Sequence, residues 1–212
     1  MKPRASTSDA DYTKWLRRQE SLWWKRLLDV QRPYRRHLRS LDLGLVLDVG
    51  CGLGRNLHNL AGKGVGVDHN PESVATVRER GYTAFLPEEF LASEYGRPGR
   101  FDSLLLSHVA EHMHFDEARE LVATYLPFIR IGARVVLITP QDVGFRSDPT
   151  HVEFFDFKAL NRLATSLGLE VEKHYSFPFP RFIGHLFKHN EFVLLARKQS
   201  FSPSSSTRPA SS

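Results

Sequence analysis

The chain has 212 residues, of which 41% are hydrophobic and 25% are charged, and this length and composition suit one globular domain. No apolar run approaches the ~18 residues that a membrane span needs, and no apolar stretch follows the first charges, so we expect neither a spanning helix nor a secretory signal. The one cysteine, Cys51, can form no internal disulfide, which favours a reducing compartment and a cytoplasmic protein.

Positive charge is concentrated near the N-terminus. Residues 1–41 hold 11 Lys or Arg and 4 Asp or Glu, a net charge of +7, and the remaining residues hold 18 and 20, a net charge of −2. Trp15, Trp23 and Trp24 lie among these basic residues. Three interpretations remain open: a cap that packs on the core or covers the substrate, a surface for nucleic-acid phosphates, and a surface for anionic lipid head groups.

The first elements in chain order are helical. Residues 1–8 are polar and predict a disordered tail. Residues 9–31 carry apolar side chains at spacings of three, four and seven, which predict an amphipathic helix. A proline interrupts this pattern, and a second short helix is expected over 34–41. We therefore expect a basic helical cap over 9–41 and, at the other end, a disordered tail rich in Ser and Pro over 199–212.

Short apolar runs then alternate with helical stretches. The expected strands are 45–49, 64–68, 83–86, 101–107, 134–139, 169–174 and 190–196. The expected helices are 55–61, 71–80 and 115–126. Continuous apolar strands that alternate with helices predict a parallel sheet covered on both faces. The expected fold is therefore α/β, with a Rossmann-like, seven-stranded, mostly parallel sheet and helices on both faces, over residues 42–198.

A glycine-rich loop joins the first of these strands to the first helix. It follows Asp48 and contains Gly50, Gly52 and Gly54, which let the backbone approach a ligand closely at a helix N-terminus. The dinucleotide-binding spacing G-x-G-x-x-G has a third glycine where this chain has an arginine, so the spacing here is the tighter G-x-G-x-G. Asp68 ends the next strand, where a carboxylate can accept hydrogen bonds from both hydroxyls of a ribose.

This order of motifs resembles the class I S-adenosylmethionine-dependent methyltransferases. The resemblance rests on segments 48–54, 66–68 and 101–113, covers about residues 41–198, and points to small-molecule methyltransferases that carry an H-x-x-E-H segment after the fourth strand. It implies S-adenosyl-L-methionine as the cofactor, with the glycine loop beneath its methionine part and Asp68 on its ribose.

The resemblance also implies an acidic residue near the end of the third strand that binds the adenine amino group. In this chain Glu88 or Glu89 must take that place, and the choice between them stays open. The cofactor-binding residues that we expect are Asp48, Gly50, Cys51, Gly52, Gly54, Asp68, His69, Glu88, Glu89, Ser107, His108 and Glu111.

The segment after the fourth strand also matches the H-x-x-E-H spelling of an inverted zinc-protease motif. That zinc site needs both histidines on one face of a helix, whereas His108 comes directly after an apolar strand, so we expect no metal here. We expect instead that Ser107, His108 and Glu111 lie at the carboxyl edge of the sheet, where α/β proteins bind ligands. His112 and Met113 either join them or only begin the next helix.

A polar segment, 148–155, follows the fifth strand and is expected at the same edge of the sheet. It makes His151 the first candidate for a general base, with His108 the second; either could instead only shape the pocket through hydrogen bonds. Orientation of reactants contributes about 7–11 kcal/mol, and a general base contributes about 10²–10⁴-fold. Alignment is therefore expected to supply most of the acceleration of methyl transfer.

The sequence thus predicts a methyltransferase that acts on a hydroxyl, or less favourably an amine, of a small molecule, lipid or sugar. One alternative is an RNA methyltransferase that holds its substrate with the basic N-terminal helices. Another is a non-catalytic protein that binds S-adenosylmethionine. Peripheral membrane contact and the oligomeric state stay open.

Overall fold

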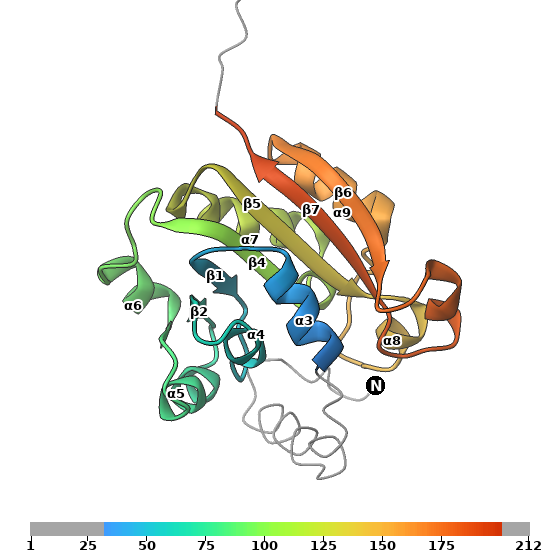
Figure 1. The fold of residues 1–212 in the computed structure, drawn as a ribbon, viewed down its shortest axis with the longest axis horizontal. Helices are drawn as coiled ribbons and strands as arrows, with labels where there is room; N and C mark the ends of the chain where they lie inside the picture. Colours follow the sequence, from blue (N-terminus) through green and yellow to red (C-terminus); the bar gives the residue numbers. More distant parts are fainter. Residues whose placement is uncertain (1–31, 201–212) are drawn as a thin grey trace, which may run out of the picture.

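The computed structural model describes residues 32–200, and our expectations for residues 1–31 and 201–212 lie outside this range (Figure 1). The α-helices are α3 (Arg32–Ser40), α4 (Arg55–Asn59), α5 (Pro71–Glu79), α6 (Pro87–Ala92), α7 (Phe115–Tyr125), α8 (Asp142–Arg146) and α9 (Phe157–Ser166). The 3₁₀ helices are η1 (Ala110–His112), η2 (Leu126–Phe128) and η3 (Arg181–His185). The strands are β1 (Val46–Val49), β2 (Gly64–Val67), β3 (Ala84–Phe85), β4 (Phe101–Ser107), β5 (Ile129–Pro140), β6 (Leu169–Phe177) and β7 (Glu191–Lys198).

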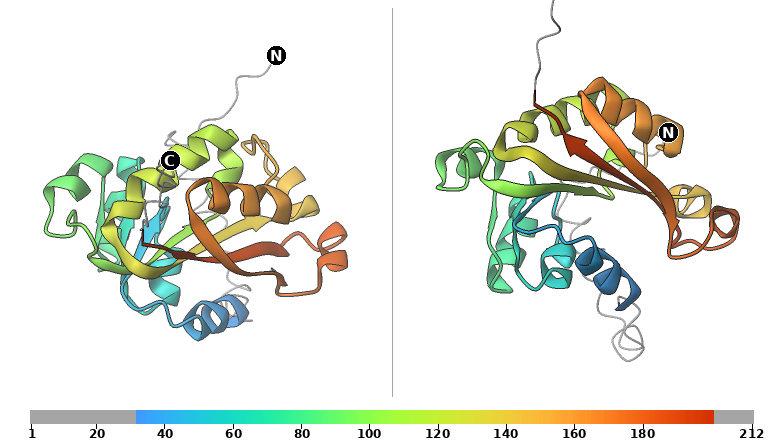
Figure 2. Two further views of the ribbon diagram at one scale, coloured as in Figure 1. Left: turned by 90° about the horizontal axis from the view of Figure 1, so that it is seen from above. Right: turned by 45° about the horizontal axis from the view of Figure 1, so that its top comes forward.

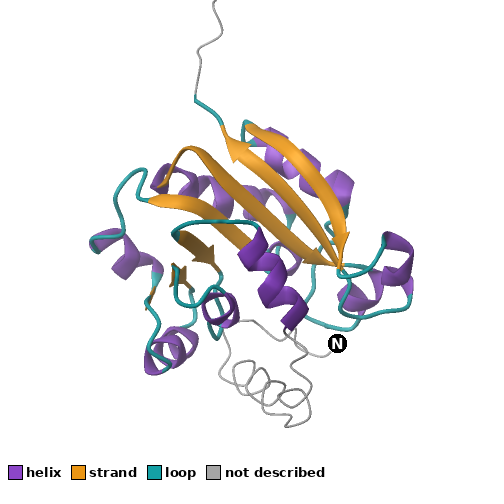
Figure 3. Ribbon diagram, in the orientation of Figure 1, coloured by secondary structure: helices purple, strands orange, loops and turns teal. Residues whose placement is uncertain are grey.

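The strands form one seven-stranded sheet in the order β3-β2-β1-β4-β5-β7-β6 (Figure 3). Neighbouring strands are parallel except at β7, which runs antiparallel to β5 and to β6. This is the Rossmann-like, mostly parallel sheet that the sequence predicts. Because β7 is reversed, its first residue, Glu191, lies beside Pro140 at the end of β5. A residue that begins a strand therefore reaches the carboxyl edge of the sheet.

Helices cover both faces of the sheet, with α3 and α4 on one side and α7 and α9 on the other (Figure 2). On the first side, Leu38 of α3 packs with Val46 and Leu105. The neighbouring residues Leu47 and Leu104 belong to the core on the opposite side. Successive strand residues point to opposite faces, so an uninterrupted apolar run is what fills both cores.

One long helix was missed by the prediction from sequence. Helix α9 begins after Asp156, whose Oδ1 accepts a hydrogen bond from the backbone N of Ala159 at 2.9 Å. The helix buries Leu160, Leu163 and Ala164, whose spacings of three and four are helical. The signal for this helix was therefore present in the sequence. Helices α6 and α8 have only six and five residues and are too short for a periodic pattern to predict.

Helix α3 is the described part of the expected N-terminal cap. The ring of His37 stacks on Phe177 with centroids 4.1 Å apart, and its Nε2 lies 2.6 Å from the hydroxyl oxygen of Tyr175. The hydroxyl of Tyr34 donates a hydrogen bond to the carbonyl of His189. These contacts tie α3 to β6 and to the segment before β7. Among residues 32–200, no helix has the length and apolar character to cross a membrane.

Candidate active site

The glycine loop turns sharply between β1 and α4. Gly50, Gly52 and Gly54 have φ angles of 71°, 51° and 77°, in the left-handed region that favours glycine. A Cβ on Gly50 would lie 2.4 Å from Cγ2 of Val109, so only glycine lets the loop pass so close to the segment after β4. A Cβ on Gly52 would meet no atom of residues 32–200 within 4 Å, so no described residue fills the space beside Gly52.

Two aspartates flank the loop. Asp48 is fully buried, and its Oδ1 accepts a hydrogen bond from the side-chain amide of Asn56 at 3.3 Å. Its other oxygen, Oδ2, accepts none from the part of the chain that the structure describes, and burial raises the pKa of Asp48 to about 7. Asp68 accepts hydrogen bonds from the backbone N of Gly52 at 2.8 Å and of Asn70 at 2.9 Å. The carboxylate of Asp68 therefore holds the glycine loop in place.

Two neighbouring residues that we expected at the cofactor lie differently. The side chain of Cys51 packs into an apolar cluster with Leu57 and Val77, and burial raises the pKa of its thiol. Only its backbone lies at the turn of the loop, where its N donates to the carbonyl of Val67 at 3.2 Å. His69 is exposed, with its Nδ1 3.8 Å from Oδ1 of Asp68.

The two glutamates after β3 differ in what they contact. Glu88 and Glu89 are both exposed in the first turn of α6. Oε2 of Glu89 accepts hydrogen bonds from the backbone N of Leu86 at 3.0 Å and from the guanidinium of Arg78 at 2.5 Å. These bonds lower the pKa of Glu89. Glu89 is thus engaged in holding the start of α6, which leaves Glu88 as the better candidate for a contact with a ligand.

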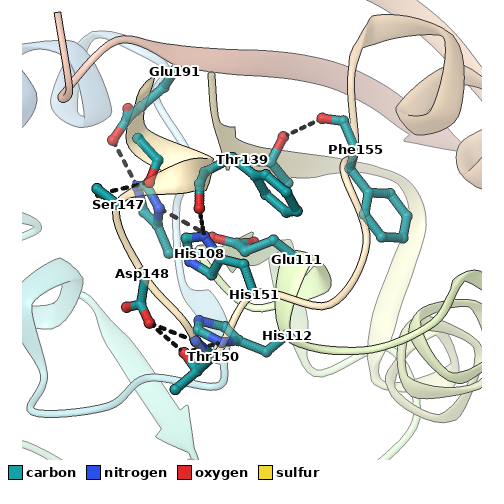
Figure 4. A network of polar contacts seen from close by, with 12 residues as sticks. His108, Glu111, His112, Thr139, Ser147, Asp148, Thr150, His151, Phe155 and Glu191 are labelled. Atoms are coloured by element: carbon teal, nitrogen blue, oxygen red, sulfur yellow. Dashed lines mark hydrogen bonds and ion pairs between the residues drawn. The ribbon is translucent and has the colours of Figure 1, made fainter. Parts of the chain in front are cut away.

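His108 lies directly after Ser107, the buried last residue of β4. Its φ of 58° is rare for a residue other than glycine, and such strain is often found at functional sites. Its Nε2 is 2.7 Å from Oε1 of Glu191, and its Nδ1 is 3.3 Å from Oε1 of Glu111 (Figure 4). Burial alone lowers the pKa of His108, but the two carboxylates outweigh it and raise the pKa to about 9.

This geometry argues against His108 as a general base. A protonated imidazole has no nitrogen lone pair, and both ring nitrogens of His108 are occupied by carboxylates. His108 is expected to be protonated because two buried acids, Glu111 and Glu191, contact it. Glu191 is 83 residues away in the sequence, so the motif around His108 does not reveal this contact. His108 instead links the end of β4 to the start of β7.

The polar segment after β5 lies against η1. The backbone N of Val152 donates to the carbonyl of Glu111 at 2.6 Å, which holds the segment in place. Oγ1 of Thr150 lies 2.6 Å from Oδ1 of Asp148 and 3.0 Å from Nδ1 of His112. Burial lowers the pKa of His112. Burial raises the pKa of Asp148, but hydrogen bonds from Thr150 and nearby histidines outweigh it and lower the pKa overall.

His151 lies beside His112, with ring centroids 4.8 Å apart. Nδ1 of His151 is 2.7 Å from the carbonyl oxygen of Phe145 in α8. A carbonyl can only accept a hydrogen bond, so Nδ1 carries the proton and Nε2 carries the lone pair. The ring also stacks on that of Phe145, with centroids 5.2 Å apart. His151 is therefore held in one tautomer at the carboxyl edge of the sheet.

Glu191 is a residue of this site that the sequence did not lead us to expect. Its side chain is buried and contacts His108, and its backbone carbonyl accepts a hydrogen bond from the amide of Gln141 at 2.9 Å. A carboxylate that begins an otherwise apolar strand is an unusual pattern, and this pattern could have marked Glu191 as a candidate site residue. Its meaning depends on the direction of β7, because in a parallel strand Glu191 would lie at the opposite edge.

Comparisons with known proteins agree with this geometry. Residues 46–131 match the model of a methyltransferase domain family. A S-adenosylmethionine-dependent methyltransferase from Archaeoglobus fulgidus is 19% identical, with 84% of this chain and 98% of that chain covered and a TM-score of 0.63. The magnesium protoporphyrin IX methyltransferase of Synechocystis PCC 6803, solved with bound SAH, is 14% identical, with coverage of 92% and 98% and a TM-score of 0.61. No curated protein matches the chain.

A further methyltransferase structure, from Mesorhizobium loti, is 15% identical, with 77% of this chain and 96% of that chain covered and a TM-score of 0.56. At these identities the structural likeness establishes the fold, which is that of the class I methyltransferases. The matched domain model covers the glycine loop, both aspartates and β4. The protein is an S-adenosylmethionine-dependent methyltransferase, and S-adenosylmethionine is its cofactor.

Proposed function

We propose that the protein methylates a hydroxyl group of a small molecule, lipid or sugar, and that His151 accepts the hydroxyl proton. The observation that carries this proposal is the tautomer of His151, whose Nδ1 donates to the carbonyl of Phe145 and leaves the lone pair on Nε2. A hydroxyl oxygen must lose its proton during methylation, so an imidazole whose Nδ1 is held by a carbonyl and whose Nε2 can take a proton suits this acceptor. An amine is the less favoured acceptor. We assign the domain to residues 42–198.

The residues around the glycine loop suit the cofactor. The space beside Gly52, which no described residue fills, admits a ligand against the backbone, and the buried Oδ2 of Asp48, which accepts no hydrogen bond from the described residues, would be stabilised by a cationic ligand. In this proposal Asp48 and the loop hold the methionine part, Asp68 holds the ribose, and Glu88 holds the adenine. The cofactor supplies an activated methyl group on a positively charged sulfur.

The remaining polar residues position the acceptor end of the site. His108 joins Glu111 to Glu191, and Thr150 joins Asp148 to His112. These links hold η1, the segment after β5 and the start of β7 together. Orientation of this kind is the main source of acceleration in an in-line displacement.

An apolar surface next to this edge supports an acceptor with an apolar portion. Phe179, Phe182, Leu186 and Phe187 are exposed around η3. Helix α8 fixes η3 in place through an ion pair at 2.8 Å between Asp142 and Arg181. Four large exposed apolar side chains in one segment are uncommon on a protein surface and favour contact with a lipid or another partly apolar molecule. The basic residues before α3, which would favour RNA, lie outside the described residues.

The test is to incubate the full chain and cell extract with methyl-labelled S-adenosylmethionine and to separate RNA, lipid and small-molecule fractions. We expect the label as a methyl ether outside the RNA fraction; label in RNA, on nitrogen or as a methyl ester would contradict the proposal. With the acceptor in hand, H151A should lower kcat by about 10²-fold or more while cofactor affinity is unchanged. The matched control H114A, at an exposed histidine, should keep kcat.

A further inference from the structure

Three side chains at the acceptor end converge on one point. Donor atoms of Glu111, His112 and His151 all lie within 4.8 Å of one another (Figure 4). Glu111 is fully buried, and its oxygens accept no hydrogen bond of good geometry from the described residues. The cation beside it, His108, lies 3.3 Å from Glu111 but pairs more closely, at 2.7 Å, with the buried Glu191. Two buried carboxylates thus share one imidazolium, which favours a further positive charge at this place. We propose that Glu111, His112 and His151 bind a divalent transition-metal ion.

The contacts of His151 indicate which of its two ring nitrogens would bind the ion. Its Nδ1–H donates to the carbonyl of Phe145 at 2.7 Å, so the lone pair is on Nε2. Histidines that bind metals usually donate their second ring N–H to a carbonyl or carboxylate, which fixes the ring and its tautomer. His151 has this arrangement.

The hydroxyl of Thr150 likewise indicates which ring nitrogen of His112 would bind the ion. Oδ1 of Asp148 accepts from the backbone N of Thr150 at 2.9 Å and lies 2.6 Å from Oγ1 of the same residue. The hydroxyl proton of Thr150 therefore points to Asp148, and its oxygen accepts from Nδ1–H of His112 at 3.0 Å. The lone pair of His112 is then on Nε2. Both histidines thus have the same tautomer, each set by a different neighbour.

The histidine pair of the H-x-x-E-H spelling is not the pair that forms this site. His108 is held between Glu191 and Glu111, so it has no lone pair to donate. The second histidine comes instead from the segment after β5, which the hydrogen bond from Val152 to the carbonyl of Glu111 holds against η1. A zinc-protease site needs both histidines on one face of a helix. The present site has no such requirement, because its ligands come from η1 and from the segment after β5.

Two imidazole nitrogens and one carboxylate favour Zn²⁺, Mn²⁺, Fe²⁺ or Co²⁺ over Mg²⁺ and Ca²⁺, which prefer oxygen ligands. Bonds of about 2.0–2.2 Å at a tetrahedral angle place two ligand atoms about 3.3–3.6 Å apart, so the most widely separated donors must move together by about 1 Å. Three protein ligands leave coordination positions open, as catalytic metal sites require.

This inference rests on one part of the proposed function, the methylation of a hydroxyl, and replaces another part, the acceptor of the hydroxyl proton. An ion at this place would bind the acceptor oxygen and lower the pKa of its hydroxyl, whose proton leaves to water. The lone pair of His151 then belongs to the ion, so in the metal-bound enzyme the ion replaces His151 as the group that promotes loss of the proton.

The test is direct metal binding by the full chain, which needs no substrate. Protein stripped with a chelator is titrated with Co²⁺, followed by visible absorption, and with Zn²⁺ in competition. We expect one saturable ion per chain, and at least a tenfold loss of affinity in H112A, H151A and E111Q. H114A, which removes an exposed histidine two residues from His112, should bind as the wild type does. Thermal denaturation of each variant shows that it is folded.

The outcomes separate this inference from the proposed function. No saturable binding by folded wild-type protein, or equal binding by wild type and all three ligand variants, would overturn the metal site, even if the metal-free enzyme methylates a hydroxyl. Saturable binding that the ligand variants lose would support the site, even if the label were then found on nitrogen. Recovery of hydroxyl methylation on adding Co²⁺ or Zn²⁺ to stripped wild-type protein would support both.

Discussion

The cofactor half of the carboxyl edge comes from one continuous stretch of chain, whereas the acceptor half joins three distant ones. Asp48, the glycine loop and Asp68 lie within a single strand–helix–strand unit. On the acceptor side, Thr150 contacts His112 across 38 residues, and Glu191 contacts His108 across 83. The first half is held mainly by backbone conformation, and the second by buried charged and polar side chains. Single substitutions in the two halves should therefore change different properties, such as cofactor affinity and the pH dependence of stability.

The largest effect is expected in the cofactor half. D68A removes the carboxylate proposed to hold the ribose and the acceptor for two backbone amides. Hydrogen bonds to charged groups contribute about 1.5–3 kcal/mol each, so S-adenosylmethionine should bind about 100-fold more weakly by calorimetry. E79A, which removes an exposed carboxylate at the end of α5, is the control and should bind normally. Normal binding by D68A would remove Asp68 from the proposed site.

The next effect concerns the acceptor half and its dependence on pH. The folded-state pKa of His108 is about 9, above its ordinary value of 6.5, so its contribution to stability is complete below pH 6.5 and is lost as pH rises through 9. The loss should amount to about 3 kcal/mol in the free energy of unfolding. In E191Q the fall between pH 6.5 and 10 should be clearly smaller. Denaturant unfolding across this range measures it, and identical pH profiles would show that the ion pair is unimportant.

An effect of opposite sign is expected at Asp48. Its folded-state pKa is raised from 3.8 to about 7, so the cost of ionising the buried carboxyl grows between pH 4 and 7 and is complete above pH 7. D48N stays neutral, so without cofactor it should be more stable than the wild type at pH 8, by up to about 4 kcal/mol, and similar at pH 4. Thermal denaturation at the two pH values tests this; a variant less stable at pH 8 would contradict it. D48N should also bind S-adenosylmethionine more weakly.

The smallest effect distinguishes two exposed glutamates. Glu89 already accepts hydrogen bonds from Leu86 and Arg78, whereas Glu88 makes no such contact among those described. E88Q should weaken cofactor binding by about threefold, and E89Q should weaken it less, because one hydrogen bond at an exposed position contributes about 0.5–1.5 kcal/mol. Each variant serves as the other's control in calorimetry. The reverse order would assign the adenine contact to Glu89.

Much of the fold could be predicted because its signals are local. The apolar runs of β1 and β4 fill two cores at once, and this leaves an uninterrupted pattern in the sequence. Helix α9 also left a signal, in Leu160, Leu163 and Ala164, although it was overlooked. Helices α6 and α8 left none, because a helix of one or two turns shows no period.

The residues of the proposed cofactor half could be brought together from the sequence alone. The spacing of Gly50, Gly52 and Gly54 after Asp48, and of Asp68 after the next strand, describes a unit whose ends meet because adjacent parallel strands share one edge. The acceptor half was decided only by the tertiary structure. The reversal of β7 brings Glu191 to His108, and the backbone contacts of η1 bring His151 to Glu111 and His112. No local pattern in the sequence encodes these contacts. They depend on which strands pair with one another, although these are far apart in the chain, and on the direction of the last strand.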